Sequence, residues 1–174
     1  DAVYSVFGGN SMGGSSSGNT VTITDEGSGT YFGVGGGKTT GEATSDVCGA
    51  NDNTVSIKGK VTLVGWTFGG SATSGNADRN SLYVENTTGG ALYGGVAAGD
   101  GADVSNNTVE AVNATPQQAF AGYAPSLPTY TVTLDDNTLT LTNSSVSSAS
   151  GGAFAYNGSA EGNTVTMSNS TVGS

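Results

Sequence analysis

The sequence lacks histidine altogether and holds one cysteine, three prolines and only four basic residues among its 174 positions. A single cysteine excludes an intramolecular disulfide. Because no imidazole is present to activate the thiol of Cys48, we expect a small, partly buried side chain rather than a reactive nucleophile. Charged residues make up only 10% of the chain, which is unusual for a compact enzyme and typical of a β protein rich in hydrogen-bonded ladders.

The few charges are mostly of one sign, with 14 acidic residues and a net charge of −10. Such a surface repels nucleic acid, so we expect no nucleic-acid partner. The charge is typical of a self-repelling secreted surface, and we expect an extracellular location. No apolar run of about 18 residues and no signal or lipidation motif is present, which predicts no membrane insertion of this segment. The chain starts at Asp1 without Met, so we expect a mature form or an excised piece.

One phrase recurs six times along the chain. It reads GNTVTITDEG at 18–27, DNTVSIKG at 52–59, RNSLYVEN at 79–86, NNTVEAVN at 106–113, DNTLTLTN at 136–143 and GNTVTMSN at 162–169. Each copy contains an opening asparagine: Asn19, Asn53, Asn80, Asn107, Asn137 and Asn163. Successive asparagines are 34, 27, 27, 30 and 26 residues apart, which indicates six imperfect repeats of roughly 26–34 residues. An apolar residue followed by Gly-Gly precedes the first four copies, at Phe7, Val34, Phe68 and Tyr93.

Within each copy, apolar and polar residues alternate, which is the period of a strand with one buried face. The inward positions form one aliphatic stripe through all six copies, made of Val21, Ile23, Val55, Ile57, Leu82, Val84, Val109, Leu139, Leu141, Val165 and Met167. A two-strand unit of this size cannot bury its apolar face alone, so we expect the copies to stack into a continuous core.

Parallel stacking at ~4.8 Å per coil would place each aliphatic residue over its equivalent in the next copy. The opening asparagines would then lie at an inward-facing corner, where their amides can bond to one another as an Asn ladder. The Gly-Gly pairs suit a corner that needs a positive φ or a close backbone approach. The sequence thus predicts one all-β domain over 1–174, a parallel β-solenoid (β-helix) of about six coils. An extra strand at 130–134 is compatible with this reading.

The combination of YGG or FGG with GNTVTIT strands resembles the repeat regions of Gram-negative autotransporter passengers and related large surface adhesins. The resemblance covers essentially the whole chain and rests on the style of the repeats. It implies a right-handed β-helix at the cell surface that serves as a stalk or an adhesin. The sequence shows no signal or capping segment, so the resemblance implies a fragment or a processed piece.

Two adjacent acidic pairs, Asp25-Glu26 and Asp135-Asp136, are the candidates for paired carboxylate chemistry. Neighbours on a strand point to opposite faces, so we expect solvated turn residues rather than a catalytic pair. The stretch GDGADVSNN at 99–107 has the acidic residues and glycines of a calcium loop. It lacks both the EF-hand spacing and tandem nonapeptides, which favours an ordinary turn.

The outward-facing side chains leave two further ligand classes open. Paired outward threonines are compatible with ice binding, but Tyr83, Glu85 and Glu110 interrupt the array, and threonine is ordinary on an exposed strand face. The aromatic residues near the Gly-Gly pairs would either pack together or line an exposed stripe that stacks on sugars or a partner protein.

We therefore assign no catalytic, metal-binding or cofactor-binding residue and expect no cofactor. The interpretation we favour is a non-enzymatic, extracellular structural or adhesive solenoid of a bacterial surface protein, with host surface glycans or proteins as partners. The alternative is a subunit of an extracellular filament that partners itself by head-to-tail stacking of open ends. A polysaccharide-active β-helix enzyme is less favoured, because Arg79 and three lysines are the only basic groups.

Overall fold

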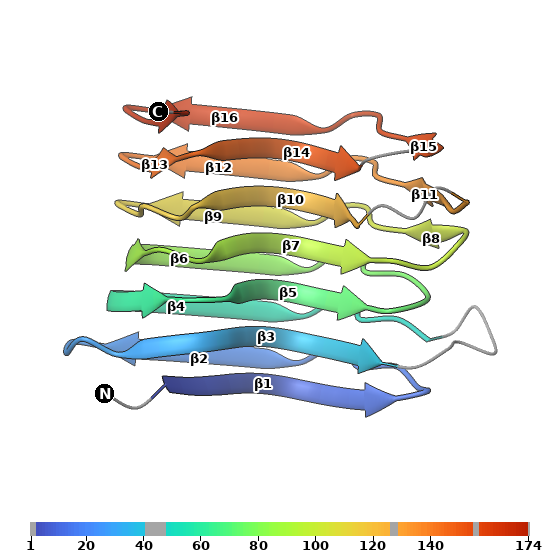
Figure 1. The fold of residues 1–174 in the computed structure, drawn as a ribbon, viewed down its shortest axis with the longest axis horizontal. Helices are drawn as coiled ribbons and strands as arrows, with labels where there is room; N and C mark the ends of the chain where they lie inside the picture. The colour runs from blue at the N-terminus through green and yellow to red at the C-terminus, as the bar shows by residue number, and fades with distance from the viewer. Residues whose placement is uncertain (1–2, 41–47, 126–128, 155–156, 174) are drawn as a thin grey trace.

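The computed structural model describes residues 3–40, 48–125, 129–154 and 157–173 (Figure 1). All the regular elements in these ranges are β-strands, and they form a parallel β-solenoid of about six coils, as the sequence predicts. None of the described residues forms a helix long and apolar enough to cross a bilayer.

Each coil contributes one strand to a front column and one to a back column (Figure 1). The front strands are β1 (Val3–Met12), β3 (Thr30–Thr40), β5 (Trp66–Ala72), β7 (Ala91–Ala97), β10 (Gln118–Ala124) and β14 (Ser148–Phe154). The back strands are β2 (Thr20–Asp25), β4 (Thr54–Leu63), β6 (Ser81–Thr88), β9 (Thr108–Val112), β12 (Thr138–Thr142) and β16 (Thr164–Ser168). Every strand pairs in parallel with its equivalent in the next coil.

Short strands close the two sides of the later coils. On one side β8 (Ala102–Asp103), β11 (Thr131–Thr133) and β15 (Asn157–Ser159) form a three-stranded sheet. On the other, β13 (Ser145–Val146) pairs with β17 (Thr171–Val172). Strand β11 lies within the segment 130–134, where the alternation was compatible with an extra strand.

The path of the chain makes the solenoid right-handed. In Figure 1 the front strands run from left to right and back strands such as β9 and β16 from right to left, while the chain climbs from the N-terminus at the bottom to the C-terminus at the top. The end of β4 turns into the front column, where it pairs with β3. This is the handedness that the resemblance to autotransporter repeat regions implies.

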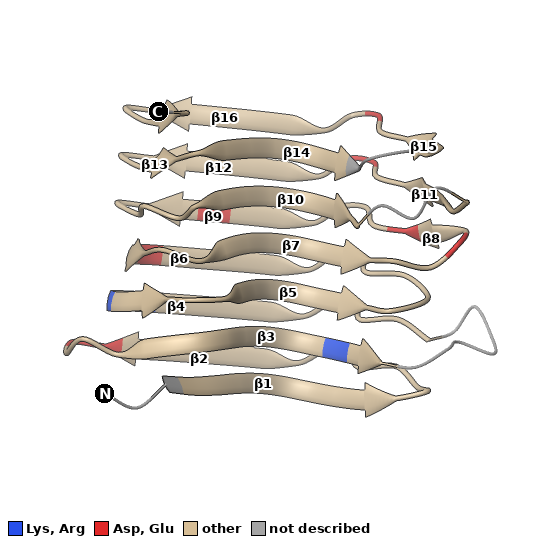
Figure 2. Ribbon diagram, viewed as in Figure 1, with Lys and Arg blue, Asp and Glu red and all other residues tan. Residues whose placement is uncertain are grey.

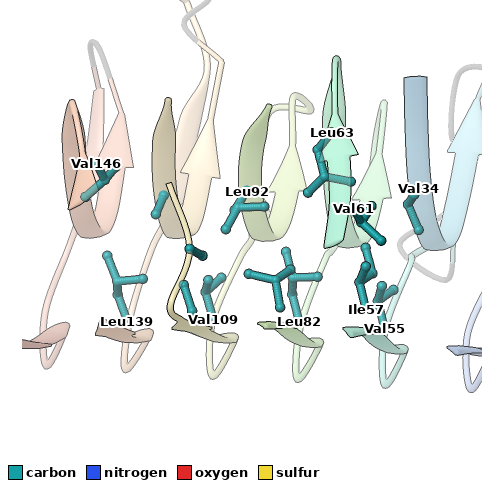
Figure 3. Close-up of a cluster of buried hydrophobic side chains, with 14 of the residues drawn as sticks. Val34, Val55, Ile57, Val61, Leu63, Leu82, Leu92, Val109, Leu139 and Val146 are labelled. Atoms are coloured by element: carbon teal, nitrogen blue, oxygen red, sulfur yellow. The ribbon is translucent and has the colours of Figure 1, made fainter. Parts of the chain in front are cut away.

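The core fills the space between the two columns (Figure 3). The aliphatic stripe of the back strands is buried from the first coil, where Val21 and Ile23 are 6% and 8% exposed, to the fifth, where Leu139 and Leu141 are fully buried. Front-strand residues such as Val34 meet them from the opposite side. Because each coil repeats the same inward positions, the core is continuous along the stack.

The sixth copy of the stripe departs from the expected core position. Val165 and Met167 lie in register with Leu139 and Leu141, yet they are 44% and 42% exposed. Figure 1 shows why: β16 lies beyond β14, and no front strand follows it. The assignment of Val165 and Met167 to the core is therefore wrong for this chain, because an inward residue of a back strand also needs cover from the next coil.

The Gly-Gly pairs lie inside the front strands rather than at corners. None of the glycines in these pairs has a positive φ, so the need for a left-handed backbone is not the reason for them. Close approach is the reason: a Cβ atom on Gly95 would lie 2.4 Å from the carbonyl oxygen of Ala77 and 2.6 Å from Nδ2 of Asn107. Glycine thus makes room for the asparagine side chain of the same coil.

Candidate functional site

The six opening asparagines form a continuous ladder of side-chain hydrogen bonds along the stack. In each of the first five, the backbone N–H and Nδ2 both donate to Oδ1 of the equivalent asparagine in the following coil, over 2.9–3.0 Å. The middle members, Asn53, Asn80, Asn107 and Asn137, are at most 1% exposed. All the donors point from the first coil toward the last, so the ladder has a direction.

The residue before each of these asparagines has a left-handed backbone. The residues at this position are Gly18, Asp52, Arg79, Asn106, Asp136 and Gly162, and their φ angles are 71°, 58°, 53°, 57°, 55° and 64° in chain order. This turn directs the following N–H and side chain into the ladder. Gly, Asn and Asp tolerate this region, whereas Arg79 adopts it at a steric cost.

Arg79 is fixed by a side-chain contact with the neighbouring coil. Its Nε and Nη2 donate to the two carboxylate oxygens of Asp52 at 2.7 and 2.9 Å. The hydrogen bond from Arg79 holds the pKa of Asp52 below its usual value. Both side chains are about half exposed, so this ion pair contributes little to stability.

A second ladder runs beside the first and is directed the opposite way. We call it the turn ladder; it consists of Ser17, Asn51, Asp78, Ser105 and Asp135. The side-chain oxygen of each member accepts the backbone N–H of the equivalent residue in the following coil, over 2.8–3.2 Å, ending with the N–H of Glu161 on Asp135. The members are of different residue types, but each has a short side chain with an oxygen that can accept a hydrogen bond from a backbone N–H.

Asp78 is the one buried carboxylate of the turn ladder with a strongly altered acidity. Its exposed fraction is 7%, and desolvation by burial raises its pKa to about 6. The backbone N–H of Ser105 donates to Asp78 and partly offsets this effect, whereas the nearby charge of Asp103 adds to it. The ladder thus holds an acidic group that is partly protonated in mildly acidic solution.

Aromatic rings gather on the outer face of the front column. We call this group the outer aromatic patch; it consists of Phe7, Trp66, Phe68, Tyr93, Phe120 and Tyr123. The residues directly before Tyr93 and Phe120, Leu92 and Ala119, belong to the core, and successive residues of a strand face opposite sides. Ring centroids are 5.1–6.0 Å apart from Phe7 to Phe68, from Trp66 to Tyr93, and among Tyr93, Phe120 and Tyr123.

The rings of the patch differ in their access to solvent. Phe68, Tyr93 and Phe120 are at most 8% exposed because they cover one another, whereas Trp66 is 54% and Phe7 37% exposed. Phe7 and Phe68 come from coils two apart and stack across Gly35, where a Cβ would lie 2.3 Å from the Phe68 ring. Lys38 lies over the Phe7 ring, 5.7 Å from its centroid. The patch is therefore a packed layer with exposed aromatic rings.

Three of the acidic candidates lie at a strand end or in loops, where they accept backbone hydrogen bonds. Asp25 accepts the N–H of Gly27, Asp100 that of Thr131 and Asp135 that of Glu161. Figure 2 shows these charges scattered over loops and separate strands. Among the described residues, no group of three or more His, Cys, Asp or Glu side chains is placed to hold a metal ion.

Cys48 lies partly buried at the edge of the described segment 48–125. Its Sγ donates to the carbonyl oxygen of Gly13 at 3.6 Å, which is a contact between successive coils. The thiol therefore has a structural neighbour on the first coil.

Sequence reasoning missed the turn ladder and the left-handed residue before each asparagine. The signal for both lay in fixed offsets: the turn ladder is two residues before the asparagine and the left-handed residue is one before. It was hidden because the residue types at these offsets change from coil to coil.

No family model, no curated protein and no solved structure matches this chain. The β-solenoid is therefore established by the structure alone, and the resemblance to autotransporter and adhesin repeats remains a prediction at the family level.

Proposed function

We propose that this chain is a non-enzymatic structural and adhesive solenoid of a bacterial surface protein, located outside the cell. It holds its coils in a rigid stack and binds partners along its side, through the outer aromatic patch. The observation that carries this proposal is the exposure of Trp66 and Phe7 on a layer of packed rings.

The chemistry of the patch suits neutral glycans of a host surface. The face of an aromatic ring is the negative side of its quadrupole and attracts the C–H groups of a sugar ring. Exposed rings held in one sheet present such faces without the entropy loss of ordering flexible loops. The net charge of −10 disfavours acidic glycans. Contiguous exposed apolar surface on a soluble protein is also typical of an interaction site.

Trp66 is the residue on which this proposal is tested. The wild-type chain and Trp66→Ala are applied to an array of neutral and acidic glycans, and the affinity for each bound glycan is then measured by calorimetry. We expect the substitution to weaken binding about tenfold or more, because a large exposed aromatic ring dominates such contacts. Val64→Ala is the matched control, since Val64 is 53% exposed and lies outside the patch. Equal binding by both variants, or none by the wild type, contradicts glycan binding at this face.

A further inference from the structure

The last coil presents unpaired backbone groups and apolar side chains. Within the described residues, no acceptor contacts the backbone N–H of Asn163, although the N–H of each preceding ladder asparagine has one. The N–H of Gly162 is likewise unpaired, whereas the equivalent N–H groups of Asp52, Arg79, Asn106 and Asp136 donate to the following coil. In the same coil, Val165, Met167 and Val172 are 42–45% exposed.

The first coil presents the complementary set. Oδ1 of Asn19 accepts no hydrogen bond within the described residues, although the Oδ1 of every later ladder asparagine accepts two. The backbone N–H of Ser17 is unpaired there too, whereas its equivalents in the later coils donate to the turn ladder. In the asparagine ladder the last coil thus offers the donors and the first coil the acceptor, whereas in the turn ladder the first coil offers the donor.

We propose that a second copy of this chain stacks its first coil on the last coil of the first copy, in the register of the interior coils. This inference is independent of side binding by the outer aromatic patch. Asn163 N–H and Nδ2 would donate to Oδ1 of Asn19 of the second copy. Ser17 N–H of the second copy would donate to the Glu161 carboxylate, as Glu161 itself donates to Asp135. Both ladders then continue across the junction.

Apolar contacts at the junction favour the same partner. Strand β1 of the second copy would follow β14 in the front column and cover Val165 and Met167, which lack a front strand beyond them. The glycine column supports the register, because Gly9, Gly37, Gly70, Gly95, Gly122 and Gly152 are partners in successive strands. In that register Ser150 pairs with Phe7 of the second copy, so Ser150 lies between the rings of Phe120 and that Phe7. Within one chain, Gly35 lies between the rings of Phe7 and Phe68 in the same way.

The direction of the two ladders predicts head-to-tail rather than head-to-head assembly. Two last coils facing each other would oppose the unpaired donor of Asn163 to another donor. Two first coils would oppose Asn19 Oδ1 to another acceptor. Head-to-tail contacts that continue the solenoid axis do not close into a ring, so they propagate into a filament. Its axial repeat would be six coils, about 29 Å at the spacing of parallel strands.

Two variants, each blocking one end, test the polarity of stacking. Met167→Lys places a charge on the uncovered apolar face of β16, and Ser17→Pro removes the unpaired N–H at the other end. Sedimentation velocity is recorded for the wild type and for each variant across a dilution series. We expect wild-type filaments that lengthen with concentration, and monomers from either variant alone. An equimolar mixture of the two variants should give dimers and nothing longer, because each partner supplies one intact end.

Val64→Lys is the matched control, since it places the same charge at a similarly exposed apolar residue inside the stack. It should leave assembly unchanged. Circular dichroism checks that each variant is folded, and Thr20→Pro replaces Ser17→Pro if the latter is not, because the N–H of Thr20 occupies the junction in the same register. Dimers of a single variant would indicate head-to-head pairing and overturn the proposal, as would a wild type that stays monomeric at every concentration.

Discussion

At the scale of single residues, the structure depends on an asparagine placed directly after a left-handed turn. The turn brings the backbone N–H and the side-chain amide of the asparagine to the same acceptor in the next coil. Because these groups are buried, they cannot bond to water, and leaving one of them without a partner would destabilise the folded chain. The two adjacent positions therefore have different roles and different tolerance to change.

Asn107 and Asn106 test this difference between neighbours. In Asn107→Ala, the N–H and Nδ2 of Asn80 lose their buried acceptor, and we expect the free energy of unfolding to fall by about 3 kcal/mol or more. Asn106 is exposed and contributes only its left-handed backbone. Asn106→Ala should cost about 1 kcal/mol and Asn106→Gly almost nothing. Urea unfolding of the three variants measures this order, and equal losses at both positions would contradict the ladder's role.

At the scale of elements, the alternating back strands could be predicted from the sequence, and the front strands only in part. In the back strands aliphatic residues alternate with threonine, and this alternation specifies one buried face whichever strand packs against it. Phe68-Gly69-Gly70 carries no such alternation, because Gly69 and Gly70 lie against Asn80 in the interior and Phe68 packs on the outside. Its glycines therefore suggested a corner. The turn ladder kept a fixed offset from the asparagine but no fixed residue type, since Ser, Asn and Asp satisfy it equally.

The buried acid of the turn ladder makes stability depend on pH. The pKa of Asp78 is raised to about 6 in the folded chain, from 3.8, so folding favours its protonated form. Below pH 3.8 the carboxyl group is protonated in both the folded and the unfolded chain and does not affect stability. Between pH 3.8 and about 6 it increasingly destabilises the folded chain, and above about 6 this cost stays constant at no more than about 3 kcal/mol. Asp52 and Asp103 raise this pKa further and Arg79 lowers it.

Asp78→Asn should therefore stabilise the chain near neutral pH. Asparagine keeps an oxygen for the N–H of Ser105 and already fills the equivalent position at Asn51. We expect a gain of about 1–3 kcal/mol near pH 7 that shrinks toward zero near pH 4. Urea unfolding at several pH values measures it. Asp100→Asn is the control, because Asp100 is exposed and also accepts a backbone N–H. A gain that does not vary with pH would show that burial of the charge is not its cause.

At the scale of the whole molecule, stability is a sum over coils that contact only their neighbours. An interior coil is covered on both sides, whereas the last coil has one neighbour and an exposed apolar face. The sequence showed six equivalent copies and therefore suggested six equivalent coils. Position in the stack, which no local pattern encodes, makes the sixth copy different. The same asymmetry should make the last coil open more readily than the interior, and make assembly its main source of protection.

Two chemically matched amides measure this opening. Thr108 and Thr164 both follow an asparagine, and each donates its N–H at 2.8 Å to the ladder asparagine of the preceding coil. In dilute solution at low salt, we expect Thr164 to exchange its amide hydrogen at least about tenfold faster than Thr108, because the last coil opens locally. Raising the salt shortens the Debye length from about 30 Å at 0.01 M to about 8 Å at 0.15 M and weakens repulsion between chains of net charge −10.

Stacking should then cover the last coil and narrow the difference between the two amides as protein concentration rises. Amide exchange measured by NMR at low and at high protein concentration separates local opening of the last coil from its covering by a second copy. Equal protection of Thr108 and Thr164 in dilute solution would show that a single neighbouring coil is enough to hold β16. The difference in exchange rate between Thr108 and Thr164 could also stay constant at high salt and high protein concentration, with Met167→Lys behaving like the wild type. That result would show that no second copy covers the last coil.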